Sequence, residues 1–400
     1  MMKLALNALL FFFFGLVLLS FFDPRQSVDF YTYYLASKAF SEGHPVYDFN
    51  VKPITNLARR EGIEHHADLY YYPPLTAQLV RPLQDIPPRR AAEIWLGVSV
   101  VAVCFSLFLF IRIAGDTVPS PVLTFLTLGF VPLYSSLLGG QVNPLLLGTM
   151  AFTFDAIRRG RMVSAGLGAA IGGLLKYIAL IYLLYLLVQR QWKALAMGLA
   201  VTIVLFFSAL PWLGIETYLT FFSMFSKMLY WNHDTVGVNL AFAQGIQAIL
   251  GPLDSEWLRL IRLLFTASIL LLTLRVCWPT ETQETEFTEL EFALCTTTIL
   301  LITPIVWYHL LLVLLIPLVV LLKQAWPEPQ RPLLLALAGL GYLALNGYGV
   351  LFYTRLGTWL PAWVPGMAFW NGIPLLVSLL WWGCLWILLF QKNVRYPVCT

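Results

Sequence analysis

The stretch MMKLALNALLFFFFGLVLLSFF, residues 1–22, contains one charged side chain, Lys3, and is long enough to cross a bilayer as a helix, which takes about 20 apolar residues. The next comparable apolar run begins near Ala91. Between them lies a polar loop, residues 23–90, with Asp29 and three of the chain's five histidines. Loops of this length are uncommon and usually have a function. The first loop is therefore where reactive residues are expected.

Composition places the chain among membrane proteins. Hydrophobic residues make up 59% of it and charged residues 12%, against roughly 25% charged in an average soluble domain. We expect a single integral membrane domain over residues 1–400, in contact with membrane lipids. The net charge of +4 is spread over many loops, as topology signals are, and does not predict nucleic-acid binding. The five cysteines show no CxxC or Cys/His ligand spacing, so neither a disulfide framework nor a metal site is expected.

Apolar runs of spanning length recur along the chain. They occupy residues 4–22, 91–113, 120–138, 191–213, 257–277, 288–306, 308–325, 331–351 and 369–391. Residues 143–157 add a medium helix, and residues 162–188 form a stretch broken at Lys176, either one bent span or a re-entrant pair. The sequence thus predicts an all-α polytopic protein with about eleven or twelve spans. Residues 214–256 are amphipathic and predict a second external segment.

Lysine and arginine set the expected orientation. Outside the first loop, most of them fall on one side if both termini are cytoplasmic, and the first loop is too long to follow this rule. We therefore expect a protein of the inner (plasma) membrane with a retained N-terminal helix and with residues 23–90 facing the periplasm or exterior. The acidic sequence at 281–291 is then cytoplasmic and is expected to be a solvated loop.

The first loop carries signals for short helices. Residues 29–42 have helical spacing and end at Gly43, and residues 51–61 predict a second helix that ends at Gly62. The sequence at 70–74 must be extended, because proline disfavours helix at the residue before it. Tyrosine prefers the membrane–water interface, so these helices are expected to lie on the bilayer surface.

Asp29 is the first candidate for chemistry. A carboxylate at the mouth of a membrane cavity can act as a general base that takes a proton from an attacking hydroxyl. The alternative is that Asp29 caps the helix that follows it, and the two roles are compatible. Asp23 is expected to be a cap or an interface residue.

Four other polar groups stand out. Gln141 and Asn143 lie in GGQVNPLLL (139–147), where Asn143 would cap a helix whose N-terminus could bind an anion, or form only a capped turn. Lys176 lies among apolar residues, which favours a functional role over snorkelling to the interface. His309 begins a span and could bind a phosphate oxygen or be a structural part of an aromatic belt. All four, with Asp29, fall on the external side in the expected topology.

Together these sequences resemble glycosyltransferase family 87 of the GT-C superfamily, whose members use polyprenyl-phosphate sugars as donors. The resemblance rests on DFYTYYLASKAFSEGHPVYD after the first span, YYYPPLTAQLVRPL before the second, GQVNPLLL, the lysine in LLKYIALIYLLYLL, and TPIVWYH. It implies a GT-C fold, transfer of a sugar at the outer face with inversion, and no metal or cofactor. Asp29 matches the family's base, and His309 matches a position near the donor phosphate. Where family members often have a second histidine, this chain has Leu310.

The resemblance also implies the substrates: a lipid-linked sugar, most often mannose, and a lipid or envelope-glycan acceptor. Lys176, His309, Asn143 and Gln141 are expected at the donor phosphate. Other substrate contacts are expected from Tyr33, Tyr34, Tyr72 and Trp307. A phosphate leaving group needs no protonation, so one base is sufficient, and the chain has no DxD sequence for a nucleotide sugar and metal. The alternatives are a transporter or flippase of lipid-linked substrates, and a ligase or polymerase of envelope glycans.

Overall fold

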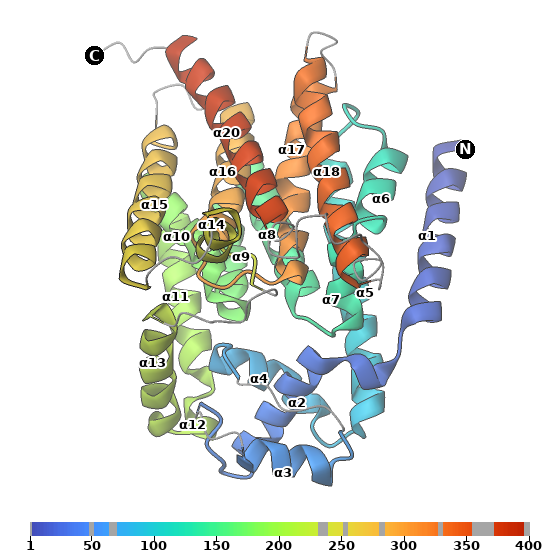
Figure 1. Ribbon diagram of the computed structural model, residues 1–400, viewed down its shortest axis with the longest axis vertical. Helices are drawn as coiled ribbons and strands as arrows, with labels where there is room; N and C mark the ends of the chain where they lie inside the picture. Colours follow the sequence, from blue (N-terminus) through green and yellow to red (C-terminus); the bar gives the residue numbers. More distant parts are fainter. Residues whose placement is uncertain are drawn as a thin grey trace.

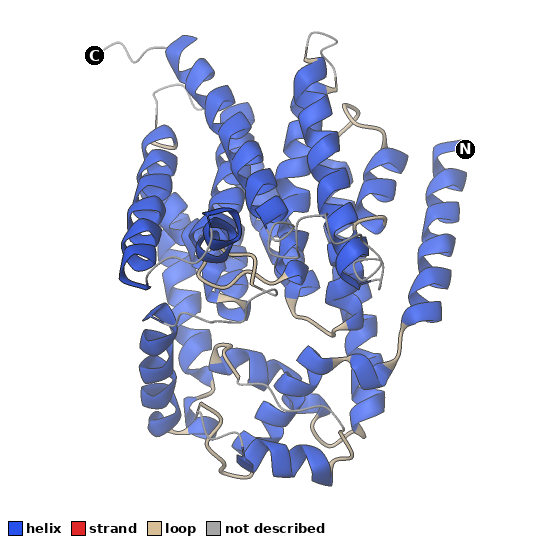
Figure 2. Ribbon diagram, in the orientation of Figure 1, coloured by secondary structure: helices blue, strands red, loops and turns tan. Residues whose placement is uncertain are grey.

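The computed structural model describes residues 2–47, 52–63, 70–230, 239–250, 255–279, 285–326, 331–353 and 372–395. The regular secondary structure of these residues is entirely helical (Figure 2). Figure 1 shows the long helices lying side by side and running alternately up and down. The N-terminal end of α1 and the C-terminal end of α20 lie at one end of the molecule, and the helices of the first loop lie at the opposite end. The prediction of an all-α fold is confirmed.

Seven helices of the described residues are long and apolar enough to cross a membrane, or eight if the pair α6 (Ser120–Leu128) and α7 (Val131–Leu138), bent by 52°, is one span. The seven are α1 (Met2–Phe21), α5 (Pro88–Ala114), α11 (Trp192–Ser208) with α12 (Leu210–Leu213), α15 (Ser255–Val276), η4 (Tyr308–Leu314) with α17 (Leu315–Ala325), α18 (Pro332–Tyr353) and α20 (Gly372–Arg395). The protein is therefore a multi-pass membrane protein.

Apolar runs predicted about eleven or twelve spans. Fewer full-length spans are present in the described residues. The remaining runs form helices that are shorter or more polar: α8 (Asn143–Arg158), α9 (Met162–Leu175), α10 (Ile181–Val188) and α16 (Thr285–Ile302). The stretch 162–188 is broken, as predicted. Lys176 has an extended backbone (φ −147°, ψ 115°) between α9 and the short η3 (Tyr177–Leu180), which leads into α10.

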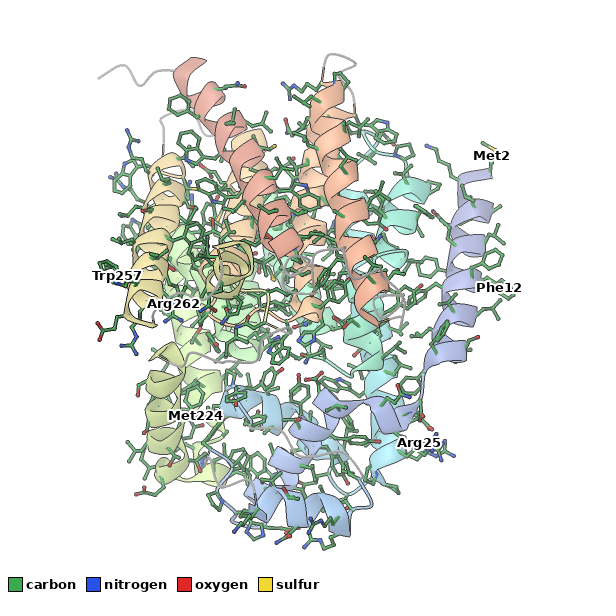
Figure 3. All side chains as sticks on the ribbon, viewed as in Figure 1. Met2, Phe12, Arg25, Met224, Trp257 and Arg262 are labelled. Carbon is green, nitrogen blue, oxygen red and sulfur yellow. The ribbon has the colours of Figure 1, made fainter. Side chains whose placement is uncertain are left out.

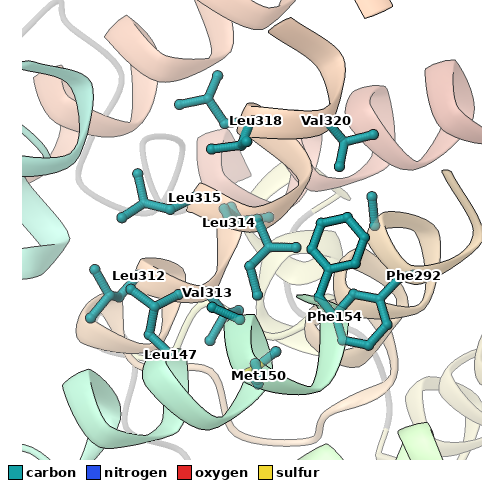
Figure 4. Close-up of a cluster of buried hydrophobic side chains, with 14 of the residues drawn as sticks. Leu147, Met150, Phe154, Phe292, Leu312, Val313, Leu314, Leu315, Leu318 and Val320 are labelled. Carbon is teal, nitrogen blue, oxygen red and sulfur yellow. The ribbon is translucent and has the colours of Figure 1, made fainter. Parts of the chain in front are cut away.

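Shorter helices pack in the centre of the bundle, where side chains of distant sequence meet (Figure 4). Phe292 of α16 stacks on Phe154 of α8 with ring centres 4.8 Å apart, and on Tyr182 of α10 at 4.3 Å. Leu314 and Leu315, at the junction of η4 and α17, are also buried in this core. This packing fixes α8, α10 and η4, which carry or adjoin residues of the candidate site.

The first loop contains η1 (Pro24–Gln26), α2 (Val28–Ser41), α3 (Lys52–Arg60), α4 (Pro74–Val80) and η2 (Arg81–Leu83). Two of these helices, α2 and α3, form as predicted from their stop signals, whereas the expected extended segment 70–74 is non-helical only to residue 73, because proline is tolerated at the first position of α4. Gly43 and Gly62 follow α2 and α3 with φ of 73° and 70°, a conformation that glycine adopts without a steric penalty. Lys38 and Glu61 form an ion pair of 2.7 Å that joins the two helices. The position of these helices on the bilayer surface stays a prediction.

Residues 214–256 are helical over most of their described part, and residues 255–256 already belong to α15. They form α13 (Ile215–Tyr230) and α14 (Phe242–Leu250). Their expected location outside the membrane stays a prediction.

The expectation of a solvated acidic loop at 281–291 is wrong for the glutamates near its end. Glu289 of α16 is 1% exposed and pairs with Arg158 at 2.6 Å and Lys323 at 2.7 Å. Glu291 is also buried and accepts hydrogen bonds from the Tyr185 hydroxyl and the Gln189 amide, both at 2.9 Å. Buried carboxylates are tolerated when they are paired in this way, which composition alone does not show. Residues 281–284 lie outside the described residues.

Candidate active site

The N-terminus of α2 rests on the turn at Gly139 and Gly140. The Gly139 carbonyl accepts hydrogen bonds from the backbone N–H of Asp29 at 3.0 Å and of Phe30 at 3.4 Å. The N-cap position belongs to Ser27, and Asp29 lies within the first turn of the helix. The interpretation of Asp29 as the cap is therefore wrong. Its half-buried carboxylate lies against the glycine turn instead.

The two glycines permit this close approach. A Cβ on Gly139 would lie 3.2 Å from the Oδ2 atom of Asp29, and a Cβ on Gly140 would lie 2.5 Å from the Cβ of Phe30. Gly140 also has a φ of 70°, which L side chains rarely adopt. The indole of Trp95 on α5 donates a hydrogen bond of 2.8 Å to the Gly140 carbonyl. Small residues thus fix the position of the Asp29 carboxylate relative to the next site residue, Gln141.

Gln141 connects two tyrosines of the first loop to this turn. Its side-chain oxygen accepts hydrogen bonds from the hydroxyls of Tyr33, at 3.1 Å, and Tyr72, at 3.2 Å. The two rings meet edge to face with centres 4.7 Å apart. Burial raises the pKa of both phenols well above the usual value, and the nearby Asp29 carboxylate adds to the effect. Both tyrosines are therefore neutral hydrogen-bond donors.

Lys176 and Asn143 meet at the break between α9 and η3. The Lys176 Nζ atom donates to the Asn143 Oδ1 atom at 2.9 Å and lies 5.6 Å from the centre of the Tyr72 ring. The predicted N-cap role of Asn143 is wrong, because Val142 occupies the cap and Asn143 is the first residue of α8. Asn143 is fully buried, and its Nδ2 atom has no hydrogen-bond partner within the described residues.

His309 is in the first turn of η4. Its backbone carbonyl accepts a hydrogen bond of 3.1 Å from the Ser136 hydroxyl of α7, which holds the turn in place. Its Nε2 atom is buried and has no partner in the part of the chain that the structure describes. The Trp307 ring lies nearly parallel to the imidazole at 6.5 Å between centres.

A pocket open to solvent lies beside Lys176, between the first loop and the segment that leads into η4, and its lining does not include Asp29, Gln141, Asn143 or His309. Its wall includes Tyr72 of the first loop, Lys176 at the helix break and Trp307 before η4. Tyr177 and Ile178 of η3, which the sequence did not single out, complete the wall beside Lys176. Most of the wall is apolar, and the lysine is its one cationic residue among the described part of the chain. The pocket can therefore take a ligand that is apolar apart from an anionic group.

Tyr34, which was expected to contact the substrate, has another role, and Asp23 has the role that was predicted for it. Tyr34 is 1% exposed and does not line the pocket. Its hydroxyl donates to the carbonyls of Gln84 and Ile86, both at 3.0 Å, so it holds α2 to the segment before α5. Asp23 caps η1 by accepting from the Arg25 N–H at 3.0 Å, as expected.

The chain matches known glycosyltransferases in sequence. The sequence model of glycosyltransferase family 87 matches residues 70–304, which include Tyr72, Gln141, Asn143 and Lys176 but neither Asp29 nor His309. Over 200 residues the chain is 26% identical to an alpha-(1->3)-arabinofuranosyltransferase of Corynebacterium glutamicum. This similarity covers 48% of the chain and 44% of the relative, so the chain spans less than half of that protein's length. Because the family match covers more than half of the chain, this protein belongs to glycosyltransferase family 87.

Proposed function

We propose that the protein transfers a sugar from a polyprenyl-phosphate donor to a hydroxyl group of a lipid or envelope glycan, with inversion at the anomeric carbon and without a metal ion. The observation that carries this proposal is Lys176 in the pocket wall, which is hydrogen-bonded to Asn143 behind it; the Asn143 Nδ2 donor is buried and has no partner within the described residues. The apolar wall suits the polyprenyl chain, and the cationic end suits its phosphate.

The unpartnered groups favour an anionic ligand. Leaving a buried polar group without a hydrogen bond costs about 1–3 kcal/mol. The Oδ1 atom of Asn143 is occupied by Lys176, which directs the Nδ2 donor elsewhere. In the neutral tautomer that carries its proton on Nε2, His309 supplies a second donor. A phosphate would accept from both and form a charge-assisted bond with Lys176.

Asp29 is proposed as the base. Its carboxylate interacts electrostatically with Lys176 and Tyr72, so it lies near the proposed phosphate site. In the reaction, Asp29 takes the proton of the acceptor hydroxyl while that oxygen forms a bond to the anomeric carbon. The bond between this carbon and the phosphate oxygen breaks, and polyprenyl phosphate leaves as an anion. Attack from the face opposite the leaving group inverts the anomeric configuration, and no general acid is needed.

Two sugars are candidates. The family resemblance favours mannose, and the arabinofuranosyltransferase similarity favours arabinofuranose. Both would be presented as polyprenyl-phosphate sugars, so the phosphate contacts proposed for Lys176, Asn143 and His309 apply to either. The active site is proposed to face the periplasm or exterior, with both termini in the cytoplasm. In support, the N-terminal end of α1 and the C-terminal end of α20 lie at the end of the molecule opposite the helices of the first loop (Figure 1).

The test is donor consumption by the purified protein in nanodiscs. Radiolabelled polyprenyl-phosphate mannose and polyprenyl-phosphate arabinofuranose are each supplied with a lipid extract as acceptor, and nucleotide sugars serve as control donors. We expect one lipid-linked donor to be consumed, with release of polyprenyl phosphate and a product of inverted anomeric configuration. Transfer from a nucleotide sugar, or a product of retained configuration, would contradict the proposal. A flippase would move the lipid without consuming it.

A further inference from the structure

A second, basic groove lies on the outside of the helical bundle. It is open to solvent, and its lining includes Arg259 and Arg262 of α15. The two arginines are three residues apart, so they lie on one face of the helix. They are about four and seven residues beyond Ser255, which places them roughly 6 and 10 Å into the helix. The groove is separate from the pocket that Lys176 lines.

The same part of α15 has the surface of a lipid-facing helix. Trp257, in the first turn of α15, lies on the outside of the bundle (Figure 3). It is 65% exposed, and Leu260 and Leu263 are 44% and 65% exposed. Tryptophan near a helix end is typical of the membrane interface, and exposed leucines beyond it are typical of contact with lipid chains. Arginine among such residues is costly unless it reaches the headgroup region or binds an anion. The pair therefore lies where lipid headgroups meet the protein.

One wall separates the groove from the candidate active site. Ile302 and Pro304 line the groove, whereas Thr303 and Ile305 line the Lys176 pocket. The side chains of this segment thus alternate between the two cavities. The Asn239 side chain holds the wall: its Nδ2 atom donates to the Pro304 carbonyl at 3.1 Å, and its Oδ1 atom accepts from the Val306 N–H at 2.8 Å.

We propose that this groove binds the phosphate headgroup of a membrane lipid, at a site distinct from the donor phosphate site at Lys176. Two guanidinium groups with one carboxylate, Glu256, leave the groove with a net positive charge. Guanidinium groups bind phosphate oxygens in a bidentate way. The exposed leucines beside them would contact the acyl or polyprenyl chain. A free phosphate ion would contact the arginines but would make no contact with this apolar surface.

The experiment counts lipids bound to the intact protein. Purified protein in a neutral detergent is incubated with polyprenyl monophosphate, without any sugar, and the retained lipids are counted by native mass spectrometry. We expect two lipids on the wild type and one on the double variant Arg259→Gln/Arg262→Gln, with binding at the groove weakened by about tenfold or more. Lys176→Met should keep the lipid of the groove. The matched control is Arg275→Gln at the other end of α15, which should still bind two.

Several results would overturn the assignment. The assignment is wrong if the double variant retains as many lipids as the wild type. It is also wrong if the wild type binds a single lipid and Lys176→Met loses it. Displacement of the groove lipid by equimolar inorganic phosphate would show that the lipid chain has no part in binding. If the glutamine variant is misfolded by gel filtration, Arg259→Lys/Arg262→Lys replaces it, because lysine keeps the charge and loses the bidentate contact. The count of two lipids rests on the proposed function, which supplies the lipid at Lys176. If that function fails, the wild type should bind one lipid, which Lys176→Met keeps and the double arginine variant loses.

Discussion

Lys176 and Asn143, 33 residues apart in sequence, are joined by a hydrogen bond of 2.9 Å at the point where α9 ends. The two residues lie at helix ends. Lys176 interrupts α9 with an extended backbone, and Asn143 begins α8 without capping it. It fixes the lysine beside the Tyr72 ring and turns the free amide donor of Asn143 away from the lysine. This pair is the basis of the proposed phosphate site.

Replacing Lys176 with methionine keeps the length of the side chain and removes its charge. A charge-assisted contact contributes about 1.5–3 kcal/mol, so the donor KM should rise roughly ten- to hundredfold. Steady-state kinetics with the lipid-linked donor measure this, and Lys193→Met, at an exposed lysine of α11, is the control. An unchanged KM in Lys176→Met would assign the lysine to snorkelling.

Asp29→Asn tests the base. Asparagine has nearly the same size but does not accept the proton, so turnover should fall on the order of 10²–10⁴-fold while donor binding is kept. The control is Asp23→Asn, which alters the cap of η1 and should remain active. Substantial activity of folded Asp29→Asn protein would sink the mechanism.

Gly139→Ala tests the position of the Asp29 carboxylate. The backbone at Gly139 is right-handed helical (φ −73°, ψ −12°), so alanine is allowed there, but its Cβ would lie 3.2 Å from the Oδ2 atom of Asp29. We expect kcat to fall by about tenfold or more, because small displacements of a reacting group are costly, with little change in donor KM. Gly97→Ala, which meets nothing within 4 Å, should behave as wild type. Equal loss in both variants would point to a general effect of alanine.

Glu289→Gln tests the buried ion pairs at the far end of the bundle. The change leaves Arg158 and Lys323 without their carboxylate partner. Breaking a buried ion pair costs about 3–5 kcal/mol, and thermal unfolding in detergent should show a marked loss of stability. The control is Glu93→Gln, whose pair with Arg90 is exposed and should contribute about 0–1 kcal/mol. A similar small change in both variants would show that the Glu289 pairs contribute little.

The sequence by itself determined the membrane class, the helical fold and the helices α2 and α3 of the first loop, and it singled out the candidate site residues. Periodicity and stop signals are local, so Gly43 and Gly62 predicted where α2 and α3 end. Isolated polar residues in apolar runs are costly, so Lys176 and His309 stood out without a structure.

Only the tertiary structure decided how these residues are used. The sequence allowed Asp29 and Asn143 to cap helices, but the caps are Ser27 and Val142, because α2 begins at Val28 and α8 at Asn143, so that both residues lie within the first turn of their helices. Tyr33 and Tyr34 are adjacent, yet successive residues on a helix point in different directions, so only Tyr33 reaches Gln141. The acidic stretch ending at 291 gave no sign of burial, since its partners, including Arg158 and Lys323, come from other helices. Pairing across a fold depends on packing, and a local pattern does not contain it.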